Sequence, residues 1–329
     1  MISLHLHTPR GIRFSRLSVV PLVLLLSICS LTRAQEPEDV IRVRTDLVAV
    51  PVVVTDQRGR RVPGLKAEDF ALTDDAKPAR IDYFASGTER VAILFAIDTS
   101  GSTREIVAQQ RAAAVALFSR FGHGSRVAVL QFSDLVRLPV PFTSDSAAVE
   151  VGFSFEASAS RGTAIFDGAA TAIRSFDGRG GFSMERRIVI LISDGLDTIS
   201  STSYSKVVEA ARGRGVSFYV IHFLLFTPRD GALAPRPPSK GFRELADQTG
   251  GRYFRIGDAK SALSPHPQYD LTPVFQAIDD DLRGQYVVGF YPGESARDNR
   301  FHEVNLVLAP RNKRRLRLQQ LLTGYELKP

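Results

Sequence analysis

The sequence contains a single cysteine, Cys29, among its 329 residues. This cysteine lies inside an N-terminal segment that we expect to be removed, so the mature chain would have none. Disulfide bonds, thiol catalysis and zinc–thiolate sites are then excluded. Beyond that segment, no apolar run is long enough to cross a membrane. The mature fold must therefore depend on its core, helped by any bound metal.

The N-terminal segment has the composition of a secretory signal peptide. Three arginines and no acidic residue precede an apolar run over residues 17–31, and the small residues Thr32 and Ala34 offer a cleavage site before Gln35. We therefore predict a signal peptide over 1–34, cleavage after Ala34 and a secreted or periplasmic protein.

Two alternatives for this segment remain open. It could be an uncleaved anchor helix, although the run is short and is interrupted by Pro21. It could also be a lipoprotein signal ending at Cys29, although Ile28 is bulky where such signals have a small residue.

Positive charge is modest once the N-terminal segment is set aside. The formal net charge is +7, and four uncompensated arginines lie within residues 1–34, which leaves +3 for the rest. A nucleic-acid partner is therefore not predicted. A basic run near the C-terminus alternates with leucine, which favours the exposed face of a strand over a site for an anionic surface. Its members are Arg311, Lys313, Arg314, Arg315 and Arg317.

The middle of the chain alternates apolar strands with helical patterns, and its two flanks contain strands only. We predict strands at 91–97, 126–132, 187–193 and 216–223, and helices at 103–121, 163–176, 204–212, 242–249 and 274–283. Residues 227–238 read as a proline-rich loop, and 285–291 with 302–308 as a hairpin.

The predicted fold class is α/β, with a doubly wound, mostly parallel sheet inserted into a small antiparallel β-sandwich. The N-terminal β segment (35–87) and the C-terminal β segment (285–329) would pair to form the sandwich. The α/β domain would occupy 88–284 between them. With 44% hydrophobic residues, the chain can bury a substantial core.

Polar side chains follow two of the predicted strands and precede one helix, at positions that should share the carboxyl edge of the sheet. All of them are oxygen donors, without histidine or cysteine. Such a set suits Mg²⁺ or Mn²⁺ better than Zn²⁺. The candidate metal residues are Asp98, Ser100, Ser102, Thr163 and Asp194.

These residues resemble the metal-ion-dependent adhesion site of von Willebrand factor type A domains. Asp98 to Ser102 (DTSGS) matches the family's D-x-S-x-S signature, Thr163 its lone threonine, and Asp194 its S/T-D-G acid. The resemblance implies that Ser100, Ser102 and Thr163 contact the metal, whereas Asp98 and Asp194 act mostly through water. It also implies a protein partner that presents an Asp or Glu to the ion.

The function predicted from these features is metal-dependent protein binding, without enzymatic activity. One alternative is a metal-assisted hydrolase or phosphotransferase, but the second aspartate that a dehalogenase-type phosphatase needs is replaced by Ser100. Another is a scaffold whose metal site is vestigial and whose sandwich makes the contacts. Asp167 and Asp197 are interpreted as helix or loop acids, and His222 as a core or solvated histidine.

Overall fold

The computed structural model describes residues 47–86, 90–101, 111–121, 124–145, 147–153, 162–177, 185–264, 268–310 and 315–327. All of them belong to one unit, Thr45–Pro329. The predicted signal peptide, Ser102 and the first part of the helix predicted at 103–121 lie outside the described residues. Within the described residues, none of the helices combines the length and apolar character needed to cross a bilayer.

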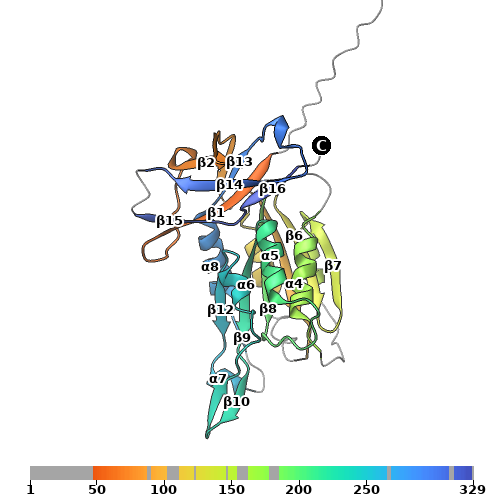
Figure 1. Ribbon diagram of the computed structural model, residues 1–329. Helices are drawn as coiled ribbons and strands as arrows, with labels where there is room; N and C mark the ends of the chain where they lie inside the picture. Colours follow the sequence, from red (N-terminus) through yellow and green to blue (C-terminus); the bar gives the residue numbers. More distant parts are fainter. Residues whose placement is uncertain are drawn as a thin grey trace, which may run out of the picture. The chain divides into compact units, whose positions relative to one another are not determined.

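The α/β part is built on a six-stranded sheet in the order β12-β9-β8-β5-β6-β7 (Figure 1). The first five strands are parallel, and β7 joins the edge antiparallel to β6. The strands are β5 (Val91–Asp98), β6 (Arg126–Phe132), β7 (Val136–Thr143), β8 (Arg186–Ser193), β9 (Val216–Phe223) and β12 (Tyr253–Ile256).

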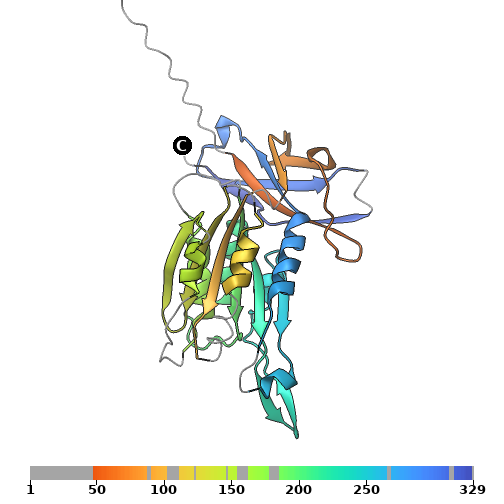
Figure 2. The ribbon, with the colours of Figure 1, turned by 180° about the vertical axis from the view of Figure 1, so that it is seen from behind.

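Helices cover both faces of this sheet (Figures 1 and 2). One face carries α4 (Ile165–Arg174), α5 (Tyr204–Gly213) and α6 (Glu244–Asp247). The other carries α2 (Arg111–Phe118), α3 (Ala147–Gly152) and α8 (Thr272–Arg283). The remaining described helical segments are η1 (Ala67–Asp69), α7 (Ala259–Ala262) and η2 (Glu294–Ala296).

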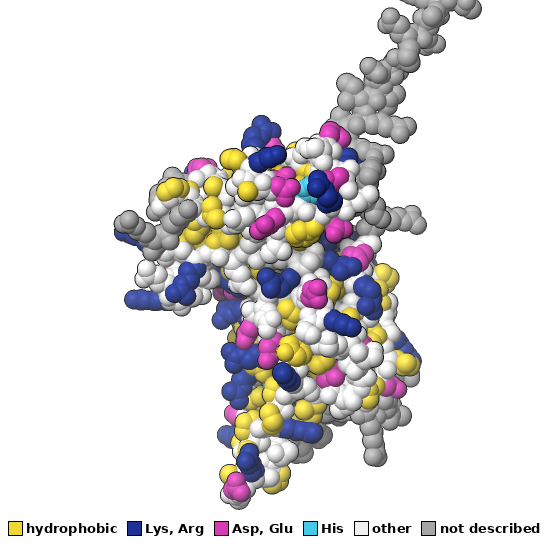
Figure 3. All heavy atoms as spheres, in the orientation of Figure 1, with side chains coloured by type: hydrophobic (Ala, Val, Ile, Leu, Met, Phe, Trp, Pro, Cys, Tyr) yellow, Lys and Arg dark blue, Asp and Glu magenta, His cyan; other side chains and the backbone are white. Residues whose placement is uncertain are grey.

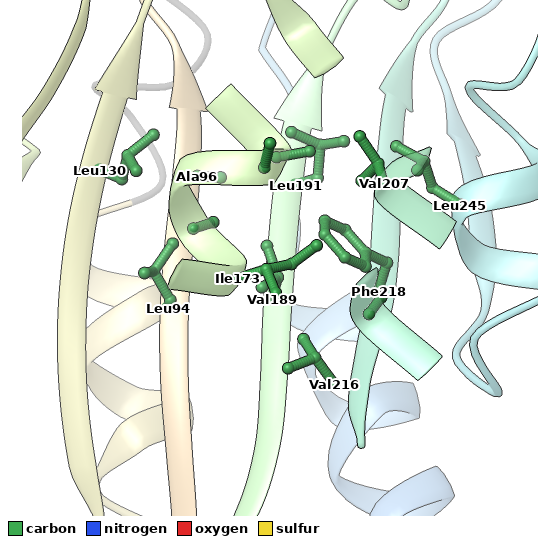
Figure 4. Packing of buried hydrophobic residues seen from close by; sticks show 14 of the residues in the cluster. Leu94, Ala96, Leu130, Ile173, Val189, Leu191, Val207, Val216, Phe218 and Leu245 are labelled. Atoms are coloured by element: carbon green, nitrogen blue, oxygen red, sulfur yellow. The ribbon is translucent and has the colours of Figure 1, made fainter. Parts of the chain in front are cut away.

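Strand β5 shows why an unbroken apolar run predicts a central strand. Ile93 and Phe95 face the core that contains α2 and α8, whereas Leu94 and Ala96 face the core under α4 and α5. Figure 4 shows the second of these cores, where Leu94 and Ala96 lie level with Val189 and Leu191 of β8, respectively. Every residue of β5 is fully buried, so neither face can be polar.

The two flanks of the chain form a sandwich of two four-stranded sheets, β15-β1-β13-β4 and β16-β14-β2-β3. All pairings within them are antiparallel. The N-terminal strands are β1 (Val48–Asp56), β2 (Phe70–Asp74), β3 (Lys77–Ala79) and β4 (Tyr83–Ser86). The C-terminal strands are β13 (Gln285–Phe290), β14 (Phe301–Leu308), β15 (Leu316–Gln320) and β16 (Gly324–Glu326).

The sandwich has its own core, to which both flanks contribute. Alternate residues of β1, such as Val50 and Val52, pack with Leu72 of β2 and with Val288 and Leu306 from the C-terminal strands. The predicted fold class, an α/β unit inserted into an antiparallel sandwich formed by the two flanks, is therefore confirmed.

Two local predictions were wrong. Strands β13 and β14 do not form a hairpin, because β13 pairs with β1 and β4, whereas β14 pairs with β2 and β16 in the other sheet. The segment predicted as a proline-rich loop instead contains a hairpin, formed by β10 (Phe226–Arg229) and β11 (Ala232–Pro235). Its turn uses Asp230 and Gly231, both with positive φ, which a two-residue hairpin turn requires.

A histidine links three segments of the sandwich. His302 of β14 contacts Asp75 through Nδ1 at 2.8 Å and Asp298 through Nε2 at 3.0 Å, and its ring stacks on that of Tyr325. The hydrogen bond with Asp75 raises the pKa of His302, Asp298 raises it further, and burial opposes both. His302 therefore ties the β2–β3 turn and the 296–300 segment to β14.

We expect the substitution His302→Gln to destabilise the protein more at about pH 5.5 than at about pH 8.5. A histidine whose folded-state pKa is raised contributes stability below its unfolded pKa and loses that contribution as the pH rises through the folded value. Thermal unfolding of both proteins at several pH values measures this. A difference in melting temperature that stays constant with pH would contradict the assigned charge.

Candidate metal centre

Asp98 lies at the last position of β5 and is fully buried. The hydroxyl of Ser193 donates to Asp98 Oδ2 at 2.6 Å, and the backbone N–H of Ser100 donates to Oδ1 at 2.9 Å. The carboxylate is thus held by the end of β8 on one side and by its own loop on the other. This second bond closes a tight turn in the backbone between Asp98 and Ser100.

Burial raises the pKa of Asp98 to about 6. Hydrogen bonds from Ser193 and Ser100 oppose this rise, whereas the negative charge of Asp194 adds to it. Two carboxylates therefore lie close enough to repel each other in a site shielded from water. A bound cation would remove both the desolvation penalty and the repulsion, so the electrostatics fit a metal ion.

Thr163 lies in the segment that leads into α4 and is held from two sides. Its N–H donates to the hydroxyl of Thr198 at 2.9 Å, and its carbonyl accepts from the N–H of Thr198 at 2.9 Å. The N–H of Ala164 donates to the carbonyl of Ser133, in the loop after β6, at 2.7 Å. Thr163 is thereby fixed between the loops that follow β8 and β6.

Asp194 follows β8 and is almost fully buried. Its Oδ1 accepts from the N–H of Leu196 at 3.0 Å, and its backbone carbonyl lies 2.9 Å from Nε2 of His222. The other nitrogen of His222 contacts the hydroxyl of Tyr253. His222 therefore supports the backbone of Asp194 from behind, with both ring nitrogens engaged.

Gly195 is required by the turn after Asp194. Its φ is +81°, a conformation that side chains rarely adopt, and an added Cβ would lie 2.9 Å from the ring of Phe242. Burial lowers the pKa of His222, which packs edge-on against the same ring. The backbone at Asp194 is thus confined by close packing as well as by hydrogen bonds.

Asp167 and Asp197 both accept hydrogen bonds from backbone N–H groups. Asp197 Oδ1 accepts from the N–H of Ile165 at 2.8 Å and so caps the first turn of α4. Asp167 accepts from the backbone N–H groups of Ser201 and Thr202, each at 2.9 Å, and these bonds lower its pKa. The two acids join the loop after β8 to the start of α4, next to Thr163.

Four of the five predicted metal residues thus belong to loops that hydrogen bonds connect at the carboxyl edge of the sheet: Asp98, Ser100, Thr163 and Asp194. Ser102 is the fifth and lies outside the described residues. Ser193, Thr198 and His222 were not predicted as part of the site. Ser193 precedes Asp194 in the family-like tripeptide, but nothing in the sequence marked Thr198 or His222.

The donor set determines which ligands a metal could use. Among the described residues, no group of three or more Asp, Glu, His or Cys side chains is arranged to hold a metal. An ion at this edge would therefore need the hydroxyl oxygens of Ser100 and Thr163, supported by Asp98 and Asp194. Such a mixed, oxygen-only set suits a hard cation such as Mg²⁺ or Mn²⁺.

Comparison with known proteins gave one match to a family model. The model for the von Willebrand factor type A domain matches residues 92–265, just over half of the chain. No curated protein matches.

Several solved structures are similar in fold. An aerotolerance-related membrane protein from Bacteroides fragilis is 18% identical, covers 58% of this chain and 98% of its own, and has a TM-score of 0.44. BatB from Bacteroides thetaiotaomicron is 20% identical, with the same coverage and a TM-score of 0.43. Proximal thread matrix protein 1 from the mussel byssus, with a zinc-occupied MIDAS motif, is 16% identical, covers 64% of this chain and 50% of its own, and has a TM-score of 0.48.

We expect the substitution Asp98→Asn to raise the melting temperature of the metal-free protein and to abolish its response to Mg²⁺. The amide removes a buried charge and its repulsion with Asp194, but it also removes the negative charge that a cation needs. Metal that binds only the folded state at 100 times its Kd stabilises by about 2.7 kcal/mol. Thermal unfolding with Mg²⁺ and with chelator measures both effects. Equal Mg²⁺ responses in the two proteins would contradict this assignment.

Ser193→Ala should weaken Mg²⁺ binding about 10- to 100-fold, because the hydroxyl orients Asp98 without being a predicted ligand. The stability of the metal-free protein should fall by only about 1 kcal/mol. Calorimetric titration with Mg²⁺ gives the affinity. Ser205→Ala, at an exposed position on α5, is the control and should bind Mg²⁺ like the unchanged protein. A loss of the same size in both variants would contradict a specific role for the Ser193 hydroxyl.

Proposed function

Because this chain belongs to the von Willebrand factor type A domain family, whose members are typically interaction modules, we propose that it binds a protein partner through a divalent cation. The cation is Mg²⁺ or Mn²⁺, and the partner contributes an Asp or Glu carboxylate. The proposal places the protein outside the cytoplasm, secreted or periplasmic, because of the signal-type sequence over residues 1–34.

One observation carries the proposal: the hydrogen bond from Ser193 to Asp98 brings the end of β8, and with it Asp194, to the end of β5. Two buried acids from different strands therefore share one site, and bonds to Thr198 bring Thr163 to the same edge. A cation bound there would supply a positive centre with a position for an incoming carboxylate.

The protein's own residues have distinct parts in this proposal. Ser100 and Thr163 offer neutral oxygens, which leave more of the cation's charge for the partner's acid than carboxylate ligands would. Asp98 and Asp194 balance charge and orient the hydroxyls. All four are at least nine-tenths buried, so the partner's acid would meet the site in surroundings that strengthen charge interactions.

We expect capture of an envelope partner in Mg²⁺ to be lost in chelator and in the Asp194→Ala variant. The measurement is a pull-down from an envelope extract with the purified protein as bait, followed by identification of the bound proteins. Asp247→Ala is the control, because Asp247 is an exposed acid on α6 whose removal changes the net charge equally. It should capture the same partner.

Two results would contradict the proposal. One is capture of the same partner by folded Asp194→Ala in chelator, which would assign the contact to another surface. The other is a Mg²⁺-dependent turnover of ester, phosphate or peptide substrates that Asp194→Ala lacks, which would assign an enzyme. Sequencing the N-terminus of the protein from its native host tests cleavage after Ala34 separately.

A further inference from the structure

A cavity rich in arginine lies where the turn after β1 meets α8 and the start of β12. Its volume is about 580 Å³. Figure 3 shows Lys and Arg side chains gathered on this side of the molecule, below the sandwich and along β12. The cavity is at the opposite end of the parallel strands from Asp98 and Asp194. Its lining residues are Arg58, Gly59, Arg60, Arg61, Gly251, Arg252, Asp280 and Asp281.

The main carboxylate of this cavity is already saturated by donors of the protein. Asp281 is 2% exposed and receives Nε and a terminal nitrogen of Arg61 at 2.6 and 2.9 Å. The hydroxyl of Tyr219 donates to it at 2.7 Å and the amide of Gln285 at 3.0 Å. A terminal nitrogen of Arg252 lies 3.9 Å from Oδ1 of the same carboxylate. Asp281 has little capacity left to neutralise more positive charge.

A second arginine is buried directly behind this carboxylate. Arg186 is fully buried, and its guanidinium donates to the side chain of Gln285 at 2.7 Å, the carbonyl of Gly215 at 3.1 Å and the hydroxyl of Ser217 at 2.5 Å. All three acceptors are neutral. Within the described part of the chain, no carboxylate forms an ion pair with Arg186.

The groups that line or back the cavity therefore carry an excess of positive charge. Arg60 is paired with Asp56 at 2.8 Å, and Asp280 accepts a hydrogen bond from Gln276 at 3.1 Å. These groups comprise five guanidinium groups and three carboxylates, so the excess is two positive charges. The guanidinium groups are those of Arg58, Arg60, Arg61, Arg186 and Arg252, and the carboxylates those of Asp56, Asp280 and Asp281.

Two of these arginines are available to a ligand. Arg58 is exposed, and its guanidinium makes no ion pair within the described residues. Arg252 has a half-exposed side chain, which lies over the ring of Phe254 and makes one distant ionic contact with Asp281. Arg317 of β15 pairs with Thr55 across the sheet, so it adds positive charge beside the same turn.

We propose that this cavity binds a phosphate group, either free or carried by a lipid headgroup. A phosphate monoester has a charge of about −1.5 to −2 at neutral pH, which matches the local excess. Guanidinium groups bind phosphate oxygens in pairs of parallel hydrogen bonds, and the four arginines of the lining provide several such pairs of donors. Asp280 is the one exposed carboxylate of the lining, and its charge is already counted in this excess. The site is independent of the metal centre.

The test is titration of the purified full-length protein with inorganic phosphate at constant ionic strength, followed by calorimetry and thermal unfolding. Saturable binding is expected, and the double variant Arg58→Gln/Arg252→Gln should weaken it at least tenfold. Arg229→Gln/Arg255→Gln is the matched control, because it removes two exposed arginines that do not line the cavity. The control should bind phosphate within about twofold of the unchanged protein. Arg58→Gln alone gives the same test if the double variant does not fold.

Vesicles distinguish the two sources of phosphate. Sedimentation with vesicles that contain phosphatidic acid, whose headgroup is a phosphate monoester, is compared with sedimentation with phosphatidylcholine vesicles. Binding to the first that depends on Arg58 and Arg252 would identify a headgroup, whereas binding of inorganic phosphate alone would identify a soluble ligand. Equal losses in the test and control variants would overturn the proposal, because they would show general charge attraction. Absence of saturable binding to both probes would also overturn it.

Discussion

The arrangement of the candidate site depends on the cost of burying the carboxylate of Asp98. A charge at the end of a fully buried strand is costly, and the site limits this cost with two hydrogen bonds, one of them from Ser193 on the neighbouring strand. That bond fixes where Asp194 lies, because Ser193 and Asp194 are adjacent. The loop after β8 also positions Thr163, because the Thr163 N–H donates to the hydroxyl of Thr198 in that loop. The cost of removing one carboxylate from water therefore explains the arrangement of residues at the carboxyl edge of the sheet.

Much of this could be predicted from the sequence. The unbroken apolar runs identified central strands, because a strand buried on both faces has no polar side, and the carboxyl ends of parallel strands share one edge. The oxygen-only residues after those strands indicated a candidate site, which stays a prediction. The supporting contacts could not be predicted, because Thr198 and His222 act through bonds between segments that are distant in sequence.

The two errors in the prediction have different causes. Strand β13 follows β12 and α8 and precedes β14, and its apolar character suggested a hairpin with β14. Instead it is buried on both faces, because it lies between the sandwich core and the α/β part, and its partner β1 lies more than 200 residues away. Local sequence carries no information on such pairings. The hairpin β10–β11 was missed because proline is unusual in strands, and here it is tolerated in an exposed two-stranded ribbon.

The insertion topology also determines how the protein would carry mechanical load. The chain enters the α/β part after Ser86 and leaves it at Gln285, and Ser86 pairs with Tyr286 across neighbouring strands. A pull between the start of β1 and the end of β16 would therefore stretch the antiparallel ladders of the sandwich first. The candidate metal centre lies at the far end of the inserted part, so its geometry would persist while the two flanks were already under tension.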